Sequence, residues 1–93
     1  MRFEWDPAKA AANLEKHGVS FPEATTAFGD PFELTIPDPD HSEQEQRFLS
    51  LGLSGENRLL LVAYTEREET IRIIHARTAA PKERRTYDSA NRT

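Results

Sequence analysis

The chain has 93 residues, no cysteine and a net charge of −4, so we expect one small hydrophobic core that no disulfide stabilises. The absence of cysteine also excludes thiol nucleophiles and the usual structural zinc sites. Because the amino terminus carries acids and no segment approaches the roughly 18 apolar residues of a membrane span, the sequence predicts a cytoplasmic protein with a single domain over residues 1–93.

The amino-terminal part of the chain predicts a strand followed by a helix. Alternation of polar and aromatic side chains at residues 2–5 is typical of a short strand. Asp6 can cap the next helix, Pro7 suits its first position, and Gly18 can adopt the left-handed conformation that ends it. We therefore expect a helix at residues 7–17.

A second helix is indicated by Ser20 and Glu23, which have the spacing of a capping box. The Ser20 hydroxyl and the Glu23 carboxylate would accept hydrogen bonds from the first free amides of this helix. Gly29-Asp30-Pro31 should end it near Phe28, because proline lacks an amide donor and restricts the residue before it.

The rest of the chain predicts four strands and a final helix. Alternating or β-branched apolar residues place strands at residues 32–36, 47–53, 58–65 and 70–78. Pro81 and Glu83 are typical of a helix start, and this helix should extend to Tyr87 or beyond. The predicted fold class is α+β, with two helices after a short first strand, a four-stranded antiparallel meander and a C-terminal helix.

Charge is distributed unevenly along the chain. Residues 1–46 hold three Lys/Arg and ten Asp/Glu, a net charge of −7, whereas residues 47–93 hold nine and six, a net charge of +3. The basic residues gather in the last strand and helix, which makes residues 71–87 the candidate surface for binding a phosphate backbone. A solvated amphipathic helix is the alternative explanation of the same charge run.

Strict alternation divides the last predicted strand into two faces. One face would hold Ile71, Ile73, His75 and Arg77, and the other Arg72, Ile74 and Ala76. Arg47, on an earlier strand, could join His75 and Arg77 across the sheet. His75 and Arg77 could instead be purely structural. The histidine would then form hydrogen bonds at the sheet edge, and Arg77 would form an ion pair with Glu83.

Two further side chains are open to two interpretations. His17 follows Lys16 in the last turn of the first predicted helix, where positive charge complements the helix dipole. His17 and His75 are also candidates for proton transfer, because an unperturbed imidazole titrates near neutrality. Tyr87 could stack on a base or pack against the sheet.

An acidic cluster in the loop before Arg47 suggests a metal-binding alternative. Its members are Asp38, Asp40, His41 and Glu43. The cluster lacks the central glycine and terminal glutamate of a calcium loop, so a solvated turn is the competing interpretation. The sequence contains no glycine-rich phosphate loop, nucleophile elbow or HExxH zinc-protease signature.

Several groups of residues are specific in their order and spacing rather than singly. They are Phe3-Glu4-Trp5-Asp6-Pro7 with Lys9 and Asn13, Lys16-His17-Gly18-Val19-Ser20-Phe21, Phe28 with Asp30-Pro31, Glu45 to Arg47, and Arg72-Ile73-Ile74-His75-Ala76-Arg77 followed by Lys82-Glu83-Arg84-Arg85 and Tyr87. Together they resemble the BrnT family of toxins from bacterial type II toxin–antitoxin systems, small proteins similar in fold to the RelE ribonucleases. The resemblance covers nearly the whole chain as one BrnT-like toxin domain.

The resemblance implies a cytoplasmic endoribonuclease that needs no metal or other cofactor and that inhibits translation by cleaving RNA. It also implies a BrnA-like ribbon-helix-helix antitoxin, bound in a two-to-two heterotetramer that contacts operator DNA through the antitoxin. The catalytic candidates are then the phosphate-binding cations Arg47 and Arg77, the further cations Lys82 and Arg85, and the proton-transfer groups His75 or His17. RNA contacts would come from Arg72, Arg84, Lys16 and Tyr87.

Two positions differ from the usual family pattern. Family members more commonly have serine in place of His75, so this histidine cannot be the general base in all of them. They commonly have Thr-Lys in place of Ala80-Pro81. The alanine lacks a capping oxygen, which costs about 1 kcal/mol, and the proline partly offsets this loss by pre-setting the helical turn.

Two other functions are compatible with the sequence. A non-catalytic, partner-binding module of a repressor complex would fit the net negative charge and the low aromatic content. A metal enzyme would use the cluster at residues 38–43.

Overall fold

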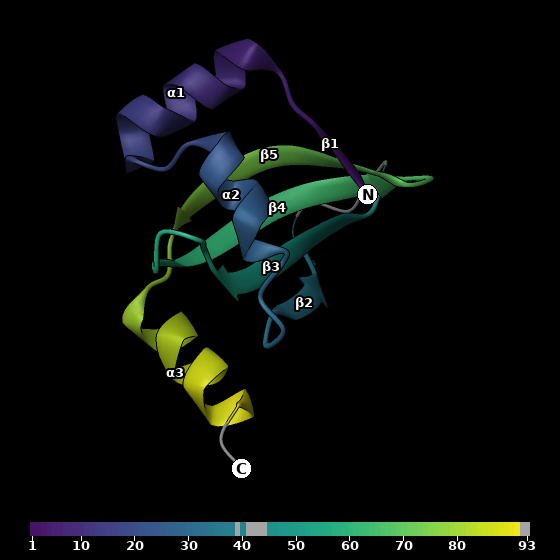
Figure 1. Ribbon diagram of the computed structural model, residues 1–93. Helices are drawn as coiled ribbons and strands as arrows, with labels where there is room; N and C mark the ends of the chain where they lie inside the picture. Colours follow the sequence, from purple (N-terminus) through teal and green to yellow (C-terminus); the bar gives the residue numbers. More distant parts are fainter. Residues whose placement is uncertain (39, 41–44, 92–93) are drawn as a thin grey trace.

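The structure is a computed structural model of the chain, and it describes residues 1–38, 40 and 45–91. Within these residues the chain forms one mixed sheet and three helices (Figure 1). The elements in chain order are β1 (Arg2–Glu4), α1 (Pro7–His17), α2 (Phe21–Ala27), β2 (Leu34–Pro37), β3 (Arg47–Leu53), β4 (Leu59–Arg67), β5 (Thr70–Thr78) and α3 (Pro81–Ala90). No helix in the described residues is both long and apolar enough to cross a membrane.

The α+β class and the element order agree with the sequence prediction, but the sheet does not match it fully. The prediction placed the first strand apart from a four-stranded antiparallel meander, whereas the sheet has five strands in the order β1-β5-β4-β3-β2. Strands β2 to β5 pair antiparallel with their neighbours, whereas β1 adds to the sheet by pairing parallel with β5. Periodicity indicated a strand at β1, but its partner lies 68 residues away, from Arg2 to Thr70, and no local pattern encodes that pairing.

The predicted helix ends are confirmed with one exception. The Asp6 carboxylate accepts from the Ala8 amide, and Gly18 ends α1 in the left-handed region at φ 69°. The Ser20 hydroxyl caps α2 by accepting from the Glu23 amide at 3.1 Å. The prediction that the Glu23 carboxylate also caps α2 is wrong, because this carboxylate instead accepts from Ser54 and Arg58.

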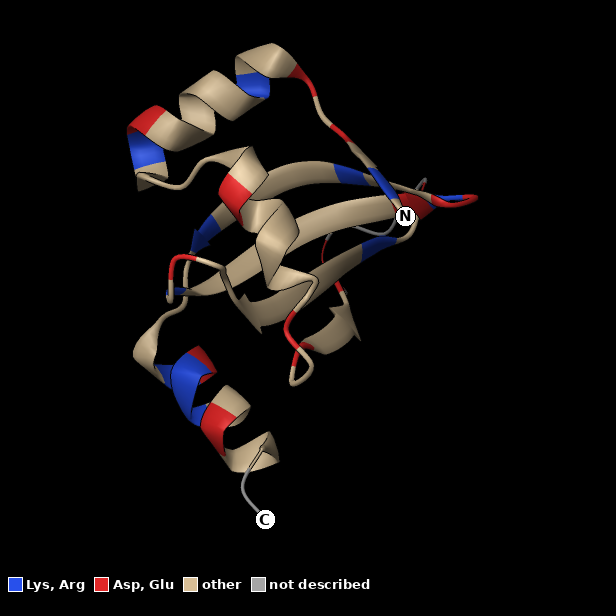
Figure 2. Cartoon of the chain, viewed as in Figure 1, with Lys and Arg blue, Asp and Glu red and all other residues tan. Residues whose placement is uncertain are grey.

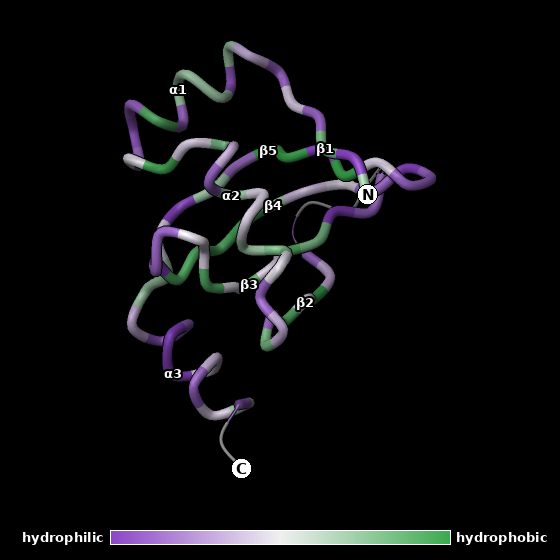
Figure 3. Tube along the Cα trace, in the orientation of Figure 1, coloured by the Kyte–Doolittle hydropathy of each residue, from purple (hydrophilic) through white to green (hydrophobic). Residues whose placement is uncertain are grey.

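The core lies between the sheet and the α1–α2 layer. Its fully buried members include Val19, Phe21, Leu60, Val62 and Ile73. Each such side chain contributes about 1.5–3 kcal/mol by leaving water. Figure 3 shows hydrophobic segments along β3, β4 and β5, while α3 is mostly hydrophilic. The core therefore fixes α1 and α2 to the sheet, and α3 stands outside it.

Asn13 fastens α1 to the sheet by hydrogen bonds from an almost fully buried side chain. Its amide nitrogen donates to the carbonyl oxygens of Val19 and Ala76 at 2.9 and 2.8 Å, and its amide oxygen accepts from the Ala76 amide at 3.1 Å. Strand β1 pairs with β5 only at residues 70–72. Asn13 thus takes the place of a neighbouring strand at Ala76 and satisfies the exposed edge of β5.

A β-bulge in β5 corrects the predicted division of its faces. The register with β4 shifts between Ala63 and Tyr64, which pair with His75 and Ile73, so Ile74 has no direct partner. Because of this extra residue, Ile71, Ile73 and Ala76 all lie in the core. His75 and Arg77 do share a face, as predicted, but Arg72 joins them and the two isoleucines do not.

Replacing Asn13 should separate its hydrogen-bonding role from mere space filling. Asn13→Ala leaves three buried backbone groups without partners and should lower the free energy of unfolding by about 2–4 kcal/mol. Asn13→Asp should cost at least as much at neutral pH, because its carboxylate would face two carbonyl oxygens. Urea unfolding measures both values, with the exposed Leu14→Ala as the control on the same helix. A parent-like exchange rate of the Ala76 amide in Asn13→Ala would contradict this role.

The start of α3 lacks one capping bond. Ala80 is the N-cap residue and has no side-chain oxygen, so only the reciprocal bond forms, from the Ala80 amide to Glu83 Oε1 at 2.7 Å. Ala80→Ser should therefore raise the free energy of unfolding by about 1 kcal/mol, measured by urea denaturation. Ala90→Ser, at the other end of α3, is the control and should change little. Equal effects of the two serines would exclude capping as the cause.

Candidate functional site

The face of the sheet turned away from α1 and α2, called here the second face, collects the basic residues predicted on the strands. Direct cross-strand neighbours point to the same side of a sheet. Arg47 pairs with Thr65 and Thr65 with Arg72, while Leu61 pairs with Arg77. The register therefore brings Arg47, Arg72 and Arg77 onto one face from three positions along the chain.

His75 and His17 meet at the edge of β5. Their Nε2 atoms lie 3.2 Å apart, and their rings are perpendicular with centroids at 4.9 Å. Both side chains are half-buried. At this distance one imidazole donates a hydrogen bond to the other, so one of the two must be in the tautomer that leaves Nε2 free to accept. The contact joins the last turn of α1 to β5 and forms the centre of the candidate site.

The surroundings of His75 oppose its protonation. Burial is the main cause of a pKa below the ordinary value of 6.5. Electrostatic interactions with His17, Arg77, Lys16 and Arg47, in that order, act in the same direction. His75 is therefore neutral at neutral pH in a cationic environment, which suits a group that accepts a proton beside bound phosphate.

A shallow hollow of about 200 Å³ opens beside the histidine pair, between α1 and β5. Its lining residues are Lys9, Ala12, Asn13, Lys16, His17, Ile74 and His75. The fold therefore places Lys16 and His17, at the end of α1, next to His75. Asn13 lies at the base of this arrangement and ties the residue after His75 to α1.

Arg77 is held by Glu83 in a two-pronged ion pair. Its two terminal nitrogens donate to the two carboxylate oxygens at 2.8 and 2.7 Å. The hydrogen bonds raise the pKa of Arg77 and lower that of Glu83. The structural alternative considered for Arg77 is therefore present, and any phosphate that binds this guanidinium has to compete with the Glu83 carboxylate.

The basic residues of α3 lie apart from the histidine pair. Lys82, Arg84 and Arg85 are exposed on its first turns, and Figure 2 shows this concentration of Lys and Arg. Tyr87 is committed to the fold, because its hydroxyl donates to the Asp30 carboxylate. Burial first, and then this bond, raises the pKa of Tyr87 to about 12.

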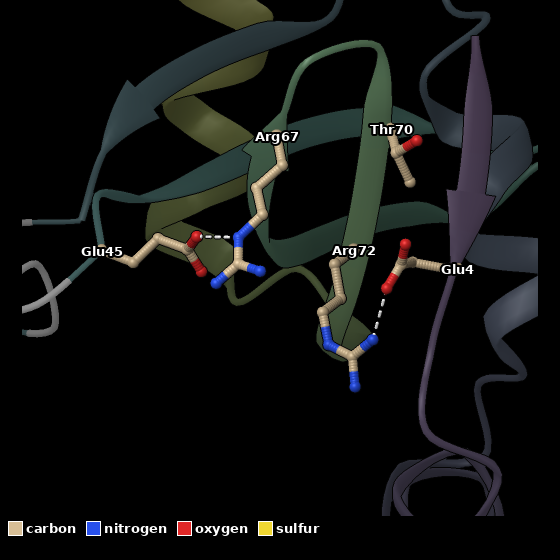
Figure 4. A pocket seen from close by; sticks show the side chains of 5 residues that line it. All are labelled: Glu4, Glu45, Arg67, Thr70 and Arg72. Atoms are coloured by element: carbon tan, nitrogen blue, oxygen red, sulfur yellow. Dashed lines mark hydrogen bonds and ion pairs between the residues drawn. The ribbon is translucent and has the colours of Figure 1, made fainter.

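Arg72 belongs to a different hollow at the other end of β5. It forms an ion pair with Glu4, and Arg67 forms one with Glu45. Figure 4 shows these two pairs facing a space of about 190 Å³ that Thr70 also lines. Arg72 shares the face of Arg77, but the structure does not bring its guanidinium to His75.

The metal-binding alternative has no support among the described residues. There, no group of three or more His, Cys, Asp and Glu side chains is placed to hold an ion. The Asp38 carboxylate accepts from the Asp40 amide at 3.1 Å. His41 and Glu43, the other members of the cluster, lie outside the described residues.

Sequence reasoning missed the positional role of Asn13. A signal for it exists, since asparagine is a poor helix former and stands here in an alanine-rich helix. That signal indicates a special role for Asn13, but it does not identify the backbone groups to which the side chain bonds.

Comparison with known families gives a match over most of the chain. The model of the family described as the ribonuclease toxin BrnT of type II toxin–antitoxin systems matches residues 5–83. The chain belongs to the BrnT family. This confirms the resemblance inferred from the sequence, and it implies an antitoxin as the partner of this BrnT-family toxin.

Solved structures give an independent comparison of the fold. The crystal structure of the Brucella abortus ribonuclease toxin BrnT resembles this BrnT-family chain with a TM-score of 0.63 and 20% sequence identity. The match covers 86% of this chain and 97% of the Brucella chain. At this identity it shows a shared fold. No match was found among curated protein sequences.

The lowered pKa of His75 should make the stability of this BrnT-family toxin depend on pH. The unfolded chain binds more protons than the folded chain below about pH 6.5, so the stability from neutral His75 is complete above that pH and is lost as the pH falls through the lowered pKa. Urea unfolding of the parent and of His75→Gln between about pH 7.5 and about pH 5 isolates this contribution. The parent should lose more stability than the variant on acidification. Parallel curves would show that His75 does not titrate differently in the folded state.

Proposed function

We propose that this BrnT-family toxin is a metal-independent endoribonuclease whose active site surrounds the His17–His75 pair. The observation that carries the proposal is the 3.2 Å contact of the two imidazoles within the field of Lys16, Arg77 and Arg47. Proton-transfer groups beside fixed cations are what cleavage of a phosphodiester by its own 2′-hydroxyl requires. Family membership supports ribonuclease activity in general, and the mechanism and residue roles belong to the proposal.

In the proposed reaction, neutral His75 accepts the proton of the ribose 2′-hydroxyl. The 2′-oxygen then attacks the adjacent phosphorus, and the bond from phosphorus to the 5′-oxygen breaks. A protonated imidazole of the pair returns a proton to the leaving 5′-oxygen, so His17 is the second proton-transfer group. The hydrogen bond between the rings provides a route by which the proton passes from one side of the reaction to the other.

Arg77 and Arg47 are the proposed phosphate-binding cations. A guanidinium stays charged at all relevant pH values and can donate two parallel hydrogen bonds to phosphate oxygens. Arg77 already holds a carboxylate in this geometry, that of Glu83. A phosphate can replace that carboxylate without a change in the shape of the contact.

The remaining basic residues are proposed to guide the RNA. Lys82 and Arg85 are proposed as further cations for a phosphate bound to Arg77, because the Arg77–Glu83 ion pair holds the start of α3 beside that arginine. Lys16, Arg72 and Arg84 bind the backbone on either side. Tyr87 is the one proposed RNA contact that is not basic. Its hydroxyl is bonded to Asp30 and its ring is half-buried, so only the exposed part of the ring can contact a base.

The proposed biological setting is inhibition of translation by RNA cleavage in the cytoplasm. The antitoxin would be a BrnA-like ribbon-helix-helix protein in a two-to-two complex, which would bind operator DNA through the antitoxin. Ribbon-helix-helix proteins act as dimers, and this is the reason for the proposed stoichiometry.

The Arg77–Glu83 pair favours a second candidate function. An arginine neutralised by its neighbour and a net charge of −4 are also expected of a non-catalytic module that acts in a repressor complex. This candidate predicts that the purified chain binds its antitoxin but leaves RNA intact.

Arginine replacements distinguish the two functions. In single-turnover cleavage of a labelled RNA with excess chelator present, Arg77→Ala should be slowed about 100-fold or more, since removal of one donor from a transition-state anion has this effect. Arg77→Lys keeps the charge but loses the fork, and should fall between the parent and Arg77→Ala. Arg2→Ala, a matched arginine on β1, should cleave like the parent.

Three results would contradict the proposed active site. Parent-like cleavage by both Arg77→Ala and Arg47→Ala would remove the arginines from it. Loss of the parent's activity in chelator would indicate a metal enzyme. Intact RNA with the parent, together with harmless expression of the toxin alone, would select the non-catalytic module.

A further inference from the structure

In two cross-strand rows, the second face of the sheet is apolar on β2 and β3 and carries a histidine and an arginine on β5. Cross-strand pairing forms one row from Ile36 through Leu49 and Ala63 to His75. The next row runs from Leu34 through Leu51 and Leu61 to Arg77. Each row thus begins with aliphatic side chains on β2 and β3 and ends with a histidine or an arginine on β5. We call the β2–β4 side the apolar half and the β5 side the cationic half.

The apolar half is partly open to solvent. Ile36 is 54% exposed on β2, and Leu53 is 37% exposed at the end of β3. Five aliphatic side chains, Ile36 among them, line a hollow of about 130 Å³ together with Glu83 and Thr86 of α3. The five are Leu34, Ile36, Leu49, Leu51 and Leu61. Exposed aliphatic side chains that adjoin an apolar hollow make this half a candidate interaction surface.

We propose that the apolar half is the docking surface of the antitoxin, and that its occupant is an amphipathic, net acidic segment. Such a segment would lay its apolar side chains over Ile36 and Leu49. Its carboxylates would lie where the rows end, next to Arg77. The proposal rests on the proposed function in one respect, that the cationic half is where RNA binds.

Charge complementarity decides for this occupant over a second copy of the chain. Arg77 ends one row with a positive charge, and Arg47 lies on the same face. Glu83 already shows how a carboxylate from outside the sheet binds Arg77 in two-pronged fashion. A second copy would offer an identical apolar and cationic face, whereas an acidic segment can place a carboxylate on Arg77 in exchange for that of Glu83.

This placement gives a physical account of neutralisation. A segment anchored on the apolar half reaches the cationic half along the same rows, so it covers Arg77 without having to enter the hollow beside the histidine pair. The apolar contacts would supply affinity, and the charge contacts would displace RNA phosphates from the arginines.

The experiment measures the dissociation constant of the full-length toxin for its cognate antitoxin, by titration calorimetry. Ile36→Glu should raise the dissociation constant by about tenfold or more, because it adds repulsion to the loss of apolar contact. Ile36→Lys should raise it less. Leu14→Lys is the matched control, since Leu14 is a 51% exposed aliphatic residue on α1, and its dissociation constant should stay within about twofold of the parent value.

Folding of each variant is checked by urea unfolding. If Ile36→Glu is unstable, the dissociation constant of Leu53→Glu, on the same face, tests the docking surface in its place. RNA cleavage by the isolated toxin is measured separately, and Ile36→Glu should cleave like the parent. An RNA-inactive parent that still shows the expected order of dissociation constants would refute the ribonuclease site while leaving the docking surface intact.

Three outcomes would overturn the docking surface. One is parent-like antitoxin binding by Ile36→Glu and Leu53→Glu. Another is a greater loss with Ile36→Lys than with Ile36→Glu, which would mean that the segment is not acidic. The third is a dimer of the isolated parent that Ile36→Glu converts to a monomer while antitoxin binding is unchanged, which would identify a second copy as the occupant.

Discussion

The candidate site depends on the hydrogen bonds of one buried amide, that of Asn13. Strand β5 has a neighbouring strand on its outer side only at residues 70–72, and Asn13 satisfies the edge further along by bonding both backbone groups of Ala76. The same side chain holds the Val19 carbonyl just after α1. Because His17 ends α1 and His75 precedes Ala76, these bonds fix the two imidazoles relative to each other. A buried, fully satisfied amide of this kind specifies one geometry more strictly than apolar packing does.

The bulge at Ile74 is the second constraint on the site. In an unbroken strand, residues two apart share a face, so Ile73 and Arg77 would lie on the same side of the sheet. The extra residue lets β5 bury Ile71 and Ile73 under the helices and still turn His75 and Arg77 to the other side. Bulges often serve to re-aim side chains near functional sites. Here the bulge lets one strand contribute both to the core and to a cationic surface.

The ion pair of Arg77 and Glu83 connects the sheet to α3, which the core does not hold. Glu83 also accepts from the Ala80 amide, so one carboxylate both begins the helix and binds the arginine. At the other end, Tyr87 bonds to Asp30 in the turn before β2. These polar contacts are weaker anchors than a buried apolar face. The proposed site requires that a phosphate or a partner's carboxylate can displace Glu83 from Arg77.

The amino-acid sequence by itself determined the elements, and it placed their ends to within about two residues. Asp6, Pro7 and Gly18 act within a few residues of their own position, so the limits of α1 follow from local chemistry. The order of residues also identified the family. The sequence further indicated that the basic carboxyl-terminal half carries the working surface.

Only the tertiary structure decided which residues meet. The parallel pairing of β1 with β5, the contact of His17 with His75 and the use of Glu23 by Arg58 all join residues far apart in the chain. Such contacts arise from chain closure and packing, which alternation within one segment cannot encode. The bulge shows the same limit within a single strand. One extra residue moves every later side chain of β5 to the opposite face of the sheet, and only the pairing of β5 with β4 reveals it.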